Sequence, residues 1–438
     1  MASRNQSQNQ AKKNRYIVLL QDTSKKSVNN AEKSMNKKLV SSQELSSTVR
    51  ANHIMAANTG IIYKNLGVAV IDDISEEKLT EMAYAAGNSV VYWEKEREYH
   101  PVTALDQLGK MKETASLLRQ QIDELEATIT DGKQKDDDLG WESATWGIKA
   151  INLMKKGYTG KGVLIACLDT GFYAPHPDFE GRNITGKSFI DGEEWDYDGN
   201  GHGTHIAGTA GGNVNSETGQ RYGVANNADL LIGKVLSDAG SGSTSGIIDA
   251  IDWAIEKGAR IVSMSLGSAV AVGEKPSPVF EQVGRRALEA NCLLIAAAGN
   301  DSRRPDQTPR PVGSPANAES IMAVAAVDEQ LKVAYFSNGG INADTGGRID
   351  ISGPGVRVYS SYSKNASGEL YATLSGTSMA TPHISGVAAL FAEAFPDLTA
   401  AELWLKLEKN AKQLDGQEAR DVGSGLIQAP LQEEEAIA

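Results

Sequence analysis

The chain has 438 residues, which is enough for two or three domains, and 40% of them are hydrophobic, which is ample for well-packed cores. A formal net charge of −13 argues against nucleic acid as a main partner. No stretch approaches the eighteen consecutive apolar residues of a membrane-spanning helix, so no membrane span is expected. The first thirty residues contain only a short apolar run at 16–20, so the sequence predicts a cytoplasmic protein, or a secreted one if a signal sequence has been removed.

The N-terminal quarter predicts a small α+β unit. Residues 1–14 are basic and rich in Ser, Asn and Gln, which indicates a disordered tail. Residues 15–100 then give the order strand–helix–strand–strand–helix–strand of the ferredoxin-like arrangement. The predicted elements are a strand at 15–21, a helical stretch at 28–50, a hairpin-like pair at 60–66 and 68–72, a helix beginning at Ser75 and a last strand at 88–94. A small binding domain is the alternative interpretation of this unit.

A heptad pattern follows, within residues 101–140. Apolar residues recur at spacings of three and four from Leu108 to Ile129, for three repeats. This pattern predicts a helix over 105–130 that either lies on the chain's own surface or self-associates with a second copy. The polar, charged residues 131–140, with glycine at 132 and 140, indicate an exposed linker.

The region 141–430 predicts an α/β domain, and residues 431–438 an acidic tail. Continuous apolar strands alternate with helices, which is typical of a mostly parallel sheet covered by helices on both faces. The strands are expected at 163–168, 229–235, 261–264, 293–298 and 321–327, and the helices at 202–211, 245–257, 279–290 and 378–394. In such sheets functional residues gather at the carboxyl ends of strands. Asp169, Ser265 and Asn300 each follow one of these strands, so one shared site is expected.

Three polar residues predict a nucleophilic triad. Asp169 closes an apolar strand, His202 opens Gly-His-Gly-Thr-His, and Ser378 lies in Gly-Thr-Ser-Met-Ala just before an apolar helical run. A serine hydroxyl is a poor nucleophile unless a base takes its proton, and that base needs an orienting carboxylate. The order Asp, His, Ser is one of three chain orders known to carry such a triad.

These three segments resemble those of the subtilisin-like serine proteases, the subtilase family, and the resemblance extends from about residue 144 to about residue 427. It implies that Asp169, His202 and Ser378 form the catalytic triad. It further implies that Asn300, in Ala-Ala-Ala-Gly-Asn, donates a side-chain hydrogen bond to the oxyanion. The strands of the 15–100 unit resemble those of subtilase propeptides, so the unit is expected to act as an intramolecular inhibitor.

The same resemblance implies where a substrate binds. The segments Gly240-Ser241-Gly242 and Ser265-Leu266-Gly267 resemble the two edges that grip an extended substrate strand. Pairing of this kind uses main-chain hydrogen bonds, and specificity then comes from side-chain pockets. Gly313 resembles part of the floor of the main pocket and is expected to leave room for a large apolar or aromatic side chain.

Calcium commonly stabilises members of the family, and three residues resemble its ligand positions: Asp178, Asn215 in a loop that is longer here, and Asp350 at a weaker site. Hard oxygen ligands of this kind suit calcium. Exposed aspartates in turns are also common, which leaves a purely structural role open for each of them.

The sequence therefore predicts a serine endopeptidase that acts on proteins or peptides and is made as a precursor. Two alternatives are a catalytically silent scaffold protein and a dedicated maturation protease for one cellular precursor. Pro101 disfavours cleavage beside the last propeptide strand, so separation of the two domains is expected within residues 130–142.

Overall fold

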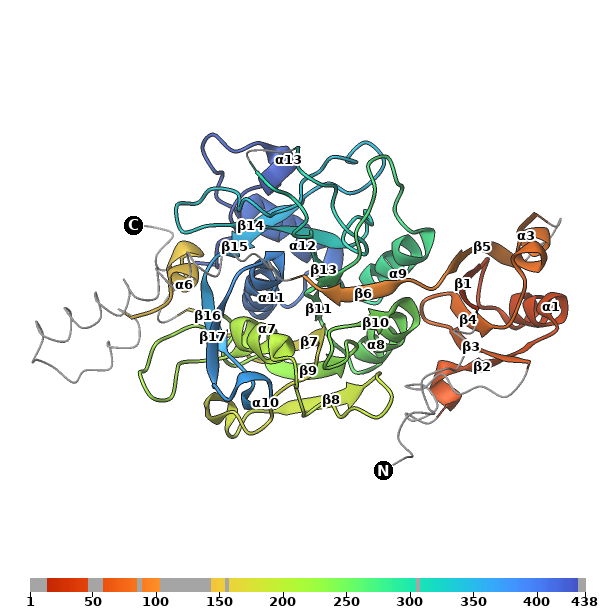
Figure 1. The fold of residues 1–438 in the computed structure, drawn as a ribbon, viewed down its shortest axis with the longest axis horizontal. Coiled ribbons are helices and arrows are strands. Elements are labelled where there is room, and N and C mark those ends of the chain that lie inside the picture. Colours follow the sequence, from red (N-terminus) through yellow and green to blue (C-terminus); the bar gives the residue numbers. More distant parts are fainter. Residues whose placement is uncertain are drawn as a thin grey trace, which may run out of the picture.

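The computed structural model describes residues 14–45, 58–84, 89–102, 143–153, 157–304 and 308–431. These residues form two bodies joined by an extended strand, β6 (Glu98–Pro101), which runs from the smaller N-terminal body across the larger one (Figure 1). The predicted heptad helix and the linker after it lie outside the described residues, and so do the two predicted tails apart from residues 14 and 431. None of the described helices is long and apolar enough to cross a membrane.

The N-terminal body is a five-stranded sheet in the order β2-β3-β4-β1-β5. Its strands are β1 (Arg15–Leu20), β2 (Lys38–Ser41), β3 (Thr59–Tyr63), β4 (Val68–Asp72) and β5 (Val90–Lys95), and its helices are α1 (Lys25–Met35), α3 (Glu76–Tyr84) and the 3-10 turn η1 (Ser42–Glu44). The four strands other than β2 pair antiparallel, as the ferredoxin-like pattern predicts.

One element of this body differs from the prediction. The helical stretch expected over 28–50 ends at Met35, because Asn36 adopts a left-handed conformation with φ 52° and its N–H caps the helix. The chain then forms β2, which pairs parallel to β3 at the sheet edge. The strand was not predicted, because its residues were included in the polar stretch that was expected to be helical.

The two faces of the N-terminal sheet have different partners, because successive side chains of a strand point to opposite faces. On one face, Val18 and the other β1 and β4 side chains that point the same way pack with residues of α1 and α3 in one apolar cluster. Ile17, Leu19 and Val70 instead belong to a cluster that includes residues of two helices of the larger body, α8 (Thr244–Glu256) and α9 (Pro278–Glu289). The second face is therefore buried between the two bodies.

The larger body is built on a seven-stranded sheet in the order β15-β14-β13-β11-β7-β9-β8, with every pair parallel. The strands are β7 (Leu164–Asp169), β8 (Ile184–Ser188), β9 (Asp229–Lys234), β11 (Ile261–Met264), β13 (Leu293–Ala297), β14 (Met322–Val327) and β15 (Ile351–Pro354). The predicted α/β class, with its parallel sheet, is confirmed.

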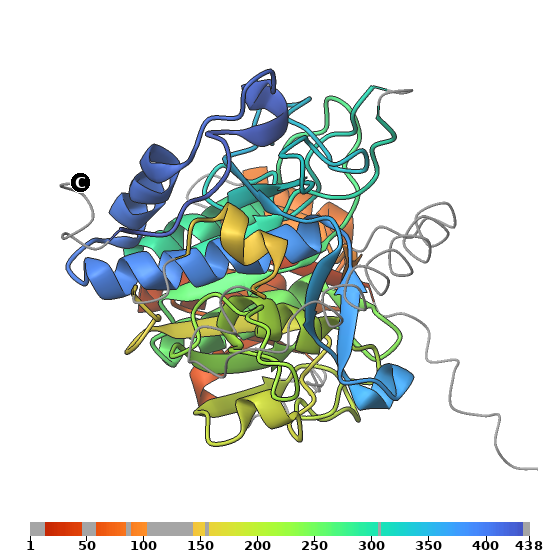
Figure 2. The same ribbon diagram turned by 90° about the vertical axis from the view of Figure 1, so that its left-hand side faces the viewer.

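Helices cover both faces of this sheet. One apolar cluster joins α8 (Thr244–Glu256) and α9 (Pro278–Glu289) to one face, and a second joins α7 (His202–Gly211), α11 (Thr377–Ala394) and α12 (Ala400–Asn410) to the other. Figure 2 shows α11 as the long blue helix lying along the sheet. The remaining elements are α6 (Trp146–Ala150), η2 (Pro177–Phe179), β16 (Val358–Ser361), α10 (Lys364–Ser367), β17 (Tyr371–Leu374) and α13 (Ala419–Val422).

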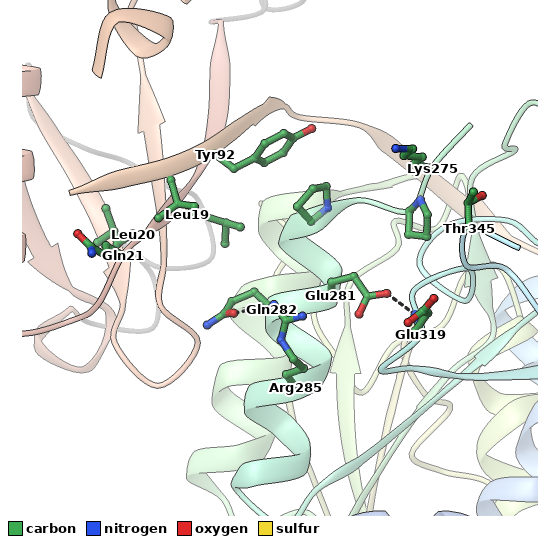
Figure 3. Close-up of a pocket in the computed structure, with 13 residues that line it drawn as sticks. Leu19, Leu20, Gln21, Tyr92, Lys275, Glu281, Gln282, Arg285, Glu319 and Thr345 are labelled. Atoms are coloured by element: carbon green, nitrogen blue, oxygen red, sulfur yellow. Dashed lines mark hydrogen bonds between the residues drawn. The ribbon is translucent and has the colours of Figure 1, made fainter. Parts of the chain in front are cut away.

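A cavity of about 680 Å³ remains between the two bodies, beside α9. Leu19 and Tyr92 of the N-terminal sheet face Glu281, Gln282 and Arg285 of this helix across it (Figure 3). None of the predicted triad residues lines this cavity, so it is a gap in the domain contact and is separate from the predicted site.

Candidate active site

The predicted aspartate and histidine are brought together at the carboxyl edge of the sheet. Asp169 is the last residue of β7 and His202 the first of α7, and both are buried. The Nδ1–H of His202 donates to Oδ1 of Asp169 over 2.7 Å, and the backbone N–H of Thr170 donates to the same oxygen over 2.8 Å. The imidazole is thereby held in the tautomer that leaves Nε2 free to accept a proton. Among the described residues, this Nε2 has no hydrogen-bond partner.

A buried carboxylate just before α7 fixes the start of this helix. Asp198 accepts hydrogen bonds from the Thr170 hydroxyl, the Gly201 N–H and the Thr204 N–H and hydroxyl, at 2.6–2.9 Å. It therefore ties the loop after Asp169 to the first turn of the helix that carries His202. Burial raises the pKa of Asp198, and these donors oppose the shift.

Gly201 has a specific backbone role immediately before His202. Its φ of 89° lies in the region that favours glycine, and a Cβ at this position would lie 2.3 Å from Cζ of Tyr362. The glycine in Gly-His-Gly is thus required by both conformation and space.

Ser378 is the second residue of α11, so its backbone N–H is one of the unpaired donors at a helix N-terminus. Its hydroxyl donates to the backbone carbonyl of Ser265 over 2.9 Å, and the Ser265 hydroxyl donates to the carbonyl of Ser378 over 2.8 Å. The serine hydroxyl is therefore engaged by the residue before β12 (Leu266–Gly267), and it must leave this carbonyl before it bonds His202, whose Nε2 has no partner among the described residues. Such loose arrangements are common before the reacting complex forms.

Asn300 is oriented by the residue that precedes Ser378. Its Oδ1 accepts the N–H of Thr377 at 2.9 Å and the Thr377 hydroxyl at 3.0 Å. This fixes which end of the amide is the donor, and Nδ2 donates to the carbonyl of Val102 over 2.7 Å. Asn300 was predicted from the sequence, but Thr377 was not, since its only local signal is its place next to the serine in Gly-Thr-Ser.

The predicted substrate edges hold a strand of the chain itself. β6 pairs antiparallel with β10 (Gly242–Ser243) on one side and with β12 on the other. The register places Tyr99 opposite Gly242, and His100 opposite Gly267. The pairing continues one residue beyond β6, where the N–H of Val102 donates to the carbonyl of Ser265 over 3.2 Å.

The other predicted edge residues lie in the same cleft. Leu266 is opposite Pro101, and the Gly240 carbonyl accepts a hydrogen bond from Nδ1 of His100 at 3.0 Å. Ser241 instead closes its own loop, because its N–H and carbonyl bond Ser237. Gly313 lies beside the Ser268 carbonyl, which a Cβ at residue 313 would approach to 2.9 Å, and the preference for a large side chain there stays a prediction.

Two further histidines near the site serve the fold. Nε2 of His205 donates to the Val358 carbonyl, and Nδ1 of His383 donates to the Met379 carbonyl. Burial lowers the pKa of His205 to about 3 and that of His383 to about 4, so both are neutral near neutral pH. Neither bonds the triad residues.

The residues predicted to bind calcium do not fit that ion. Both oxygens of Asp178 accept hydrogen bonds: Oδ1 from the Ser216 N–H at 2.9 Å and the Tyr371 hydroxyl at 2.9 Å, and Oδ2 from the Tyr222 hydroxyl at 2.7 Å. A cation needs oxygen lone pairs directed at it, whereas here hydroxyl and amide protons surround the carboxylate.

The other two predicted ligands are engaged in the same way. Oδ1 of Asn215 accepts the N–H groups of Glu217 and Thr218, and its Nδ2 donates to the Tyr359 hydroxyl. Asp350 accepts from Arg348 and from the backbone of Ala323, and burial raises its pKa to about 6. Within the described ranges no group of three or more His, Cys, Asp or Glu residues is placed to hold a metal.

An α/β sheet that carries an aspartate–histidine pair, a helix-start serine and an amide donor at its carboxyl edge defines a serine hydrolase. Residues 160–425 match the model of the subtilase family, and the chain belongs to that family. It is a subtilisin-like serine endopeptidase. The match begins at residue 160, so the N-terminal body is not part of it.

Relatives of known sequence and structure agree with this assignment. The chain is 38% identical to subtilisin DY of Bacillus licheniformis over 280 residues, covering 64% of this chain and 94% of that protein. It is 40% identical to a thermostable alkaline protease of Halalkalibacterium halodurans over 291 residues, covering 66% and 73% of the two chains. Among solved structures, sphericase superposes with a TM-score of 0.56 at 34% identity, covering 65% of this chain and 98% of its own.

Proposed function

We propose that the chain is a self-processing protease precursor, in which Asp169, His202, Ser378 and Asn300 form the catalytic centre and the N-terminal body blocks it. The observation that carries this proposal is the hydrogen bond from Nδ2 of Asn300 to the carbonyl of Val102. Together with strand pairing on both sides of β6, it gives residues 98–102 the position of a bound substrate.

The chemistry follows from this geometry. After rotating from the Ser265 carbonyl, the Ser378 oxygen bonds to the carbonyl carbon of Val102 while Nε2 of His202 takes the hydroxyl proton. Asn300 and the Ser378 backbone N–H donate to the oxyanion. His202 then gives its proton to the departing nitrogen of Thr103, and water later hydrolyses the acyl-enzyme by the same route in reverse.

The N-terminal body is expected to inhibit because several polar contacts hold it on the enzyme. Both carboxylate oxygens of Glu94 accept the hydroxyl of Ser277, the N-cap of α9, at 2.8 Å, and Glu96 accepts the N–H of Ser245 in the first turn of α8. Carboxylates at helix N-termini are favoured by unpaired N–H groups and by the helix dipole. Arg97 adds an ion pair with Glu274.

The bond expected to be cut is therefore Val102–Thr103, in place of the region 130–142 that the sequence suggested and that lies outside the described residues. Pro101 disfavours cleavage of its own N-terminal bond, but it lies one residue before Val102 and does not obstruct this one. The catalytically silent scaffold is disfavoured by the chain's membership of an endopeptidase family. A narrow maturation protease stays compatible with every residue of the site.

The test is N-terminal sequencing and intact-mass measurement of full-length protein, with Ser378→Ala as the uncut control. We expect a new N-terminus at Thr103 that is absent from the control. A first cut within 130–142, with the 102–103 bond intact in active protein, would contradict the proposed processing site. Failure of a serine-directed fluorophosphonate to label Ser378 would contradict the catalytic assignment.

A further inference from the structure

One lysine at the carboxyl edge of the sheet is completely buried and has no part in the chemistry described above. Lys234 is the last residue of β9, and in the register of the two parallel strands it lies opposite Asp169 of β7. Its side chain is 0% exposed. A charged group loses its hydration when it is buried, so it persists in such a place only with polar or charged partners. The partners of its ammonium group therefore show what this lysine holds in place.

The ammonium group of Lys234 joins three loops. It donates to the backbone carbonyl of Thr170, the residue after the catalytic aspartate, and to Oδ1 of Asp238 over 2.7 Å. It also lies 3.1 Å from Oε2 of Glu193, and the same oxygen accepts the N–H of Asp238 at 2.9 Å. These partners belong to the loops that follow β7, β9 and β8, which are neighbouring strands of the sheet.

Asp238 extends these contacts to the residues just before His202. Its Oδ1 also accepts the N–H of Gly199 at 2.9 Å, and its backbone carbonyl accepts Nδ2 of Asn200 at 3.2 Å. A Cβ at residue 199 would lie 2.6 Å from Cγ of Asp238, so the close approach of the two loops requires glycine there. The segment that leads into His202 is thus connected to Lys234 through a single carboxylate.

The loop after Lys234 also runs from the catalytic aspartate to the edge of the cleft. The N–H groups of Val235 and Leu236 donate to the carbonyl of Asp169 over 2.9 and 3.1 Å. Gly240, whose carbonyl accepts a hydrogen bond from β6, lies four residues further along. Lys234 therefore anchors a loop that contacts both the aspartate and the strand in the cleft.

We propose that Lys234 is a positioning residue for the reaction, and that its ammonium group sets the position of Asp169 relative to His202. The proposal rests on the proposed function, because it takes these two residues as the catalytic pair. Lys234 acts only through other residues and is not itself catalytic. On one side it acts through the carbonyl that follows Asp169, and on the other side it acts through Asp238.

The physical reason is that the two members of the pair come from separate parts of the chain. Asp169 ends a strand, whereas His202 begins a helix after an irregular loop, and 2.7 Å separates the bonded atoms. Without the ammonium group, the carboxylates of Glu193 and Asp238 repel each other and move apart toward solvent, since both are partly exposed. Asp238 then displaces the loop before His202. A displacement of about 1 Å costs up to about 10²-fold in rate, so we expect a loss of about tenfold for a smaller shift.

The experiment measures Lys234→Met, which keeps an unbranched apolar side chain and removes the charge. Full-length protein that has processed itself is assayed with Tyr-His-Pro-Val p-nitroanilide, and fluorophosphonate titration counts the active sites. We expect kcat per active site to fall about tenfold while KM changes less than about threefold. A purely structural role would reduce the number of titrated sites and leave kcat per site unchanged. That result, or an effect on KM alone, would overturn the proposal.

The matched control is Arg260→Met. Arg260 is also a long basic side chain that donates to backbone carbonyls, those of Asn291 and Leu398. It lies just before β11, at the opposite, amino edge of the sheet. This variant should keep the wild-type kcat per active site, and a loss equal to that of Lys234→Met would count against a specific role of the lysine.

A second variant keeps the proposal testable if Lys234→Met does not fold. Asp238→Asn changes a partly exposed side chain and keeps an oxygen for the N–H of Gly199, but it removes one charge of the ion pair. It should lower kcat about threefold, as expected for a partly exposed ion pair. In the Lys234→Met background the same change should have a smaller effect, because both residues act through one contact. An unchanged kcat in Asp238→Asn, or equal effects in the two backgrounds, would overturn the proposal.

A measurement without catalysis separates this inference from the proposed function. In full-length Ser378→Ala protein, the proton between Nδ1 of His202 and Asp169 can be followed as a low-field proton resonance. We expect Lys234→Met to shift or broaden this resonance and Arg260→Met to leave it unchanged. An unchanged resonance in Lys234→Met would overturn the proposal. If the resonance responds but the wild type hydrolyses no peptide, the proposed function fails while the positioning of the pair by Lys234 stands.

Discussion

Thr377→Val tests how the oxyanion donor is held in place. The substitution keeps the shape of the side chain and the backbone bond from the Thr377 N–H to Oδ1 of Asn300. It removes the hydroxyl that donates to the same oxygen at 3.0 Å and that accepts the N–H of Gly299 at 3.1 Å. The Asn300 amide then keeps one of its two anchors.

The expected size of the effect follows from these contacts. A neutral hydrogen bond contributes about 1 kcal/mol net, and an unanchored amide spends part of its time turned away from the carbonyl. A loss of about 1–1.5 kcal/mol in the transition state lowers kcat about fivefold to tenfold. Complete removal in Asn300→Ala should cost more, about 10²–10³-fold, a figure that is taken from subtilisin itself. KM should change little, since the bond strengthens as charge develops on the oxygen.

The assay is peptide p-nitroanilide hydrolysis, with kcat and KM determined separately and thermal unfolding measured to confirm the fold. Thr381→Val is the matched control, because it is the same substitution one turn along α11 and removes a bond to the Thr377 carbonyl without touching Asn300. A kcat for Thr377→Val equal to that of Thr381→Val would refute the reasoning. An effect on KM alone would mean that Thr377 only shapes the binding cleft.

Three other expectations follow from the described contacts. EDTA should leave the melting temperature of the Ser378→Ala protein unchanged, because the Asp178 carboxylate accepts hydrogen bonds from Tyr222 and Tyr371. Tyr371→Phe removes one of these bonds and should lower the melting temperature. A large decrease in melting temperature with EDTA would contradict this expectation. The low pKa of His205 means that the unfolded chain binds more protons than the folded one between about pH 3 and 6.5. The free energy of unfolding should therefore decrease as the pH is lowered through that range, by up to about 1.4 kcal/mol per pH unit. Urea titrations should show a smaller decrease in His205→Gln. Burial raises the pKa of Glu94 in the docked state, so docking of the N-terminal body should strengthen as the pH falls toward that pKa. Size-exclusion chromatography should show slower release of the cleaved N-terminal body at pH 5 than at pH 8. Equal release rates at the two pH values would count against this expectation.

Local patterns in the sequence were sufficient for most of the catalytic body. The helix predicted at 202–211 and the strand at 261–264 have those bounds in the structure, because an apolar run between turn residues and a glycine-flanked helix start are local signals. The N-terminal helix predicted over 28–50 was wrong in its second half. Its end depends on one asparagine in a left-handed conformation and on an edge strand stabilised by pairing with β3.

The chemistry of the site was predictable by residue type, but its supporting contacts were not. Asp169 and His202 were predicted as a pair and are hydrogen-bonded. Asp198, whose carboxylate fixes the helix start, was not among the predicted site residues. The partner of the Ser378 hydroxyl could not be predicted either, because it is a backbone carbonyl more than a hundred residues away.

By itself, then, the sequence determined which residues can act as nucleophile, base and donor, and in which strands and helices they lie, because periodicity and turn chemistry act over a few neighbours. Only the tertiary structure decided what occupies the cleft. Flexibility in the sequence favoured processing within 130–142, whereas docking of the N-terminal sheet on α8 and α9 brings residues 98–102 between β10 and β12. Strand pairing across about 140–170 residues depends on that docking, and no local pattern along the chain encodes it.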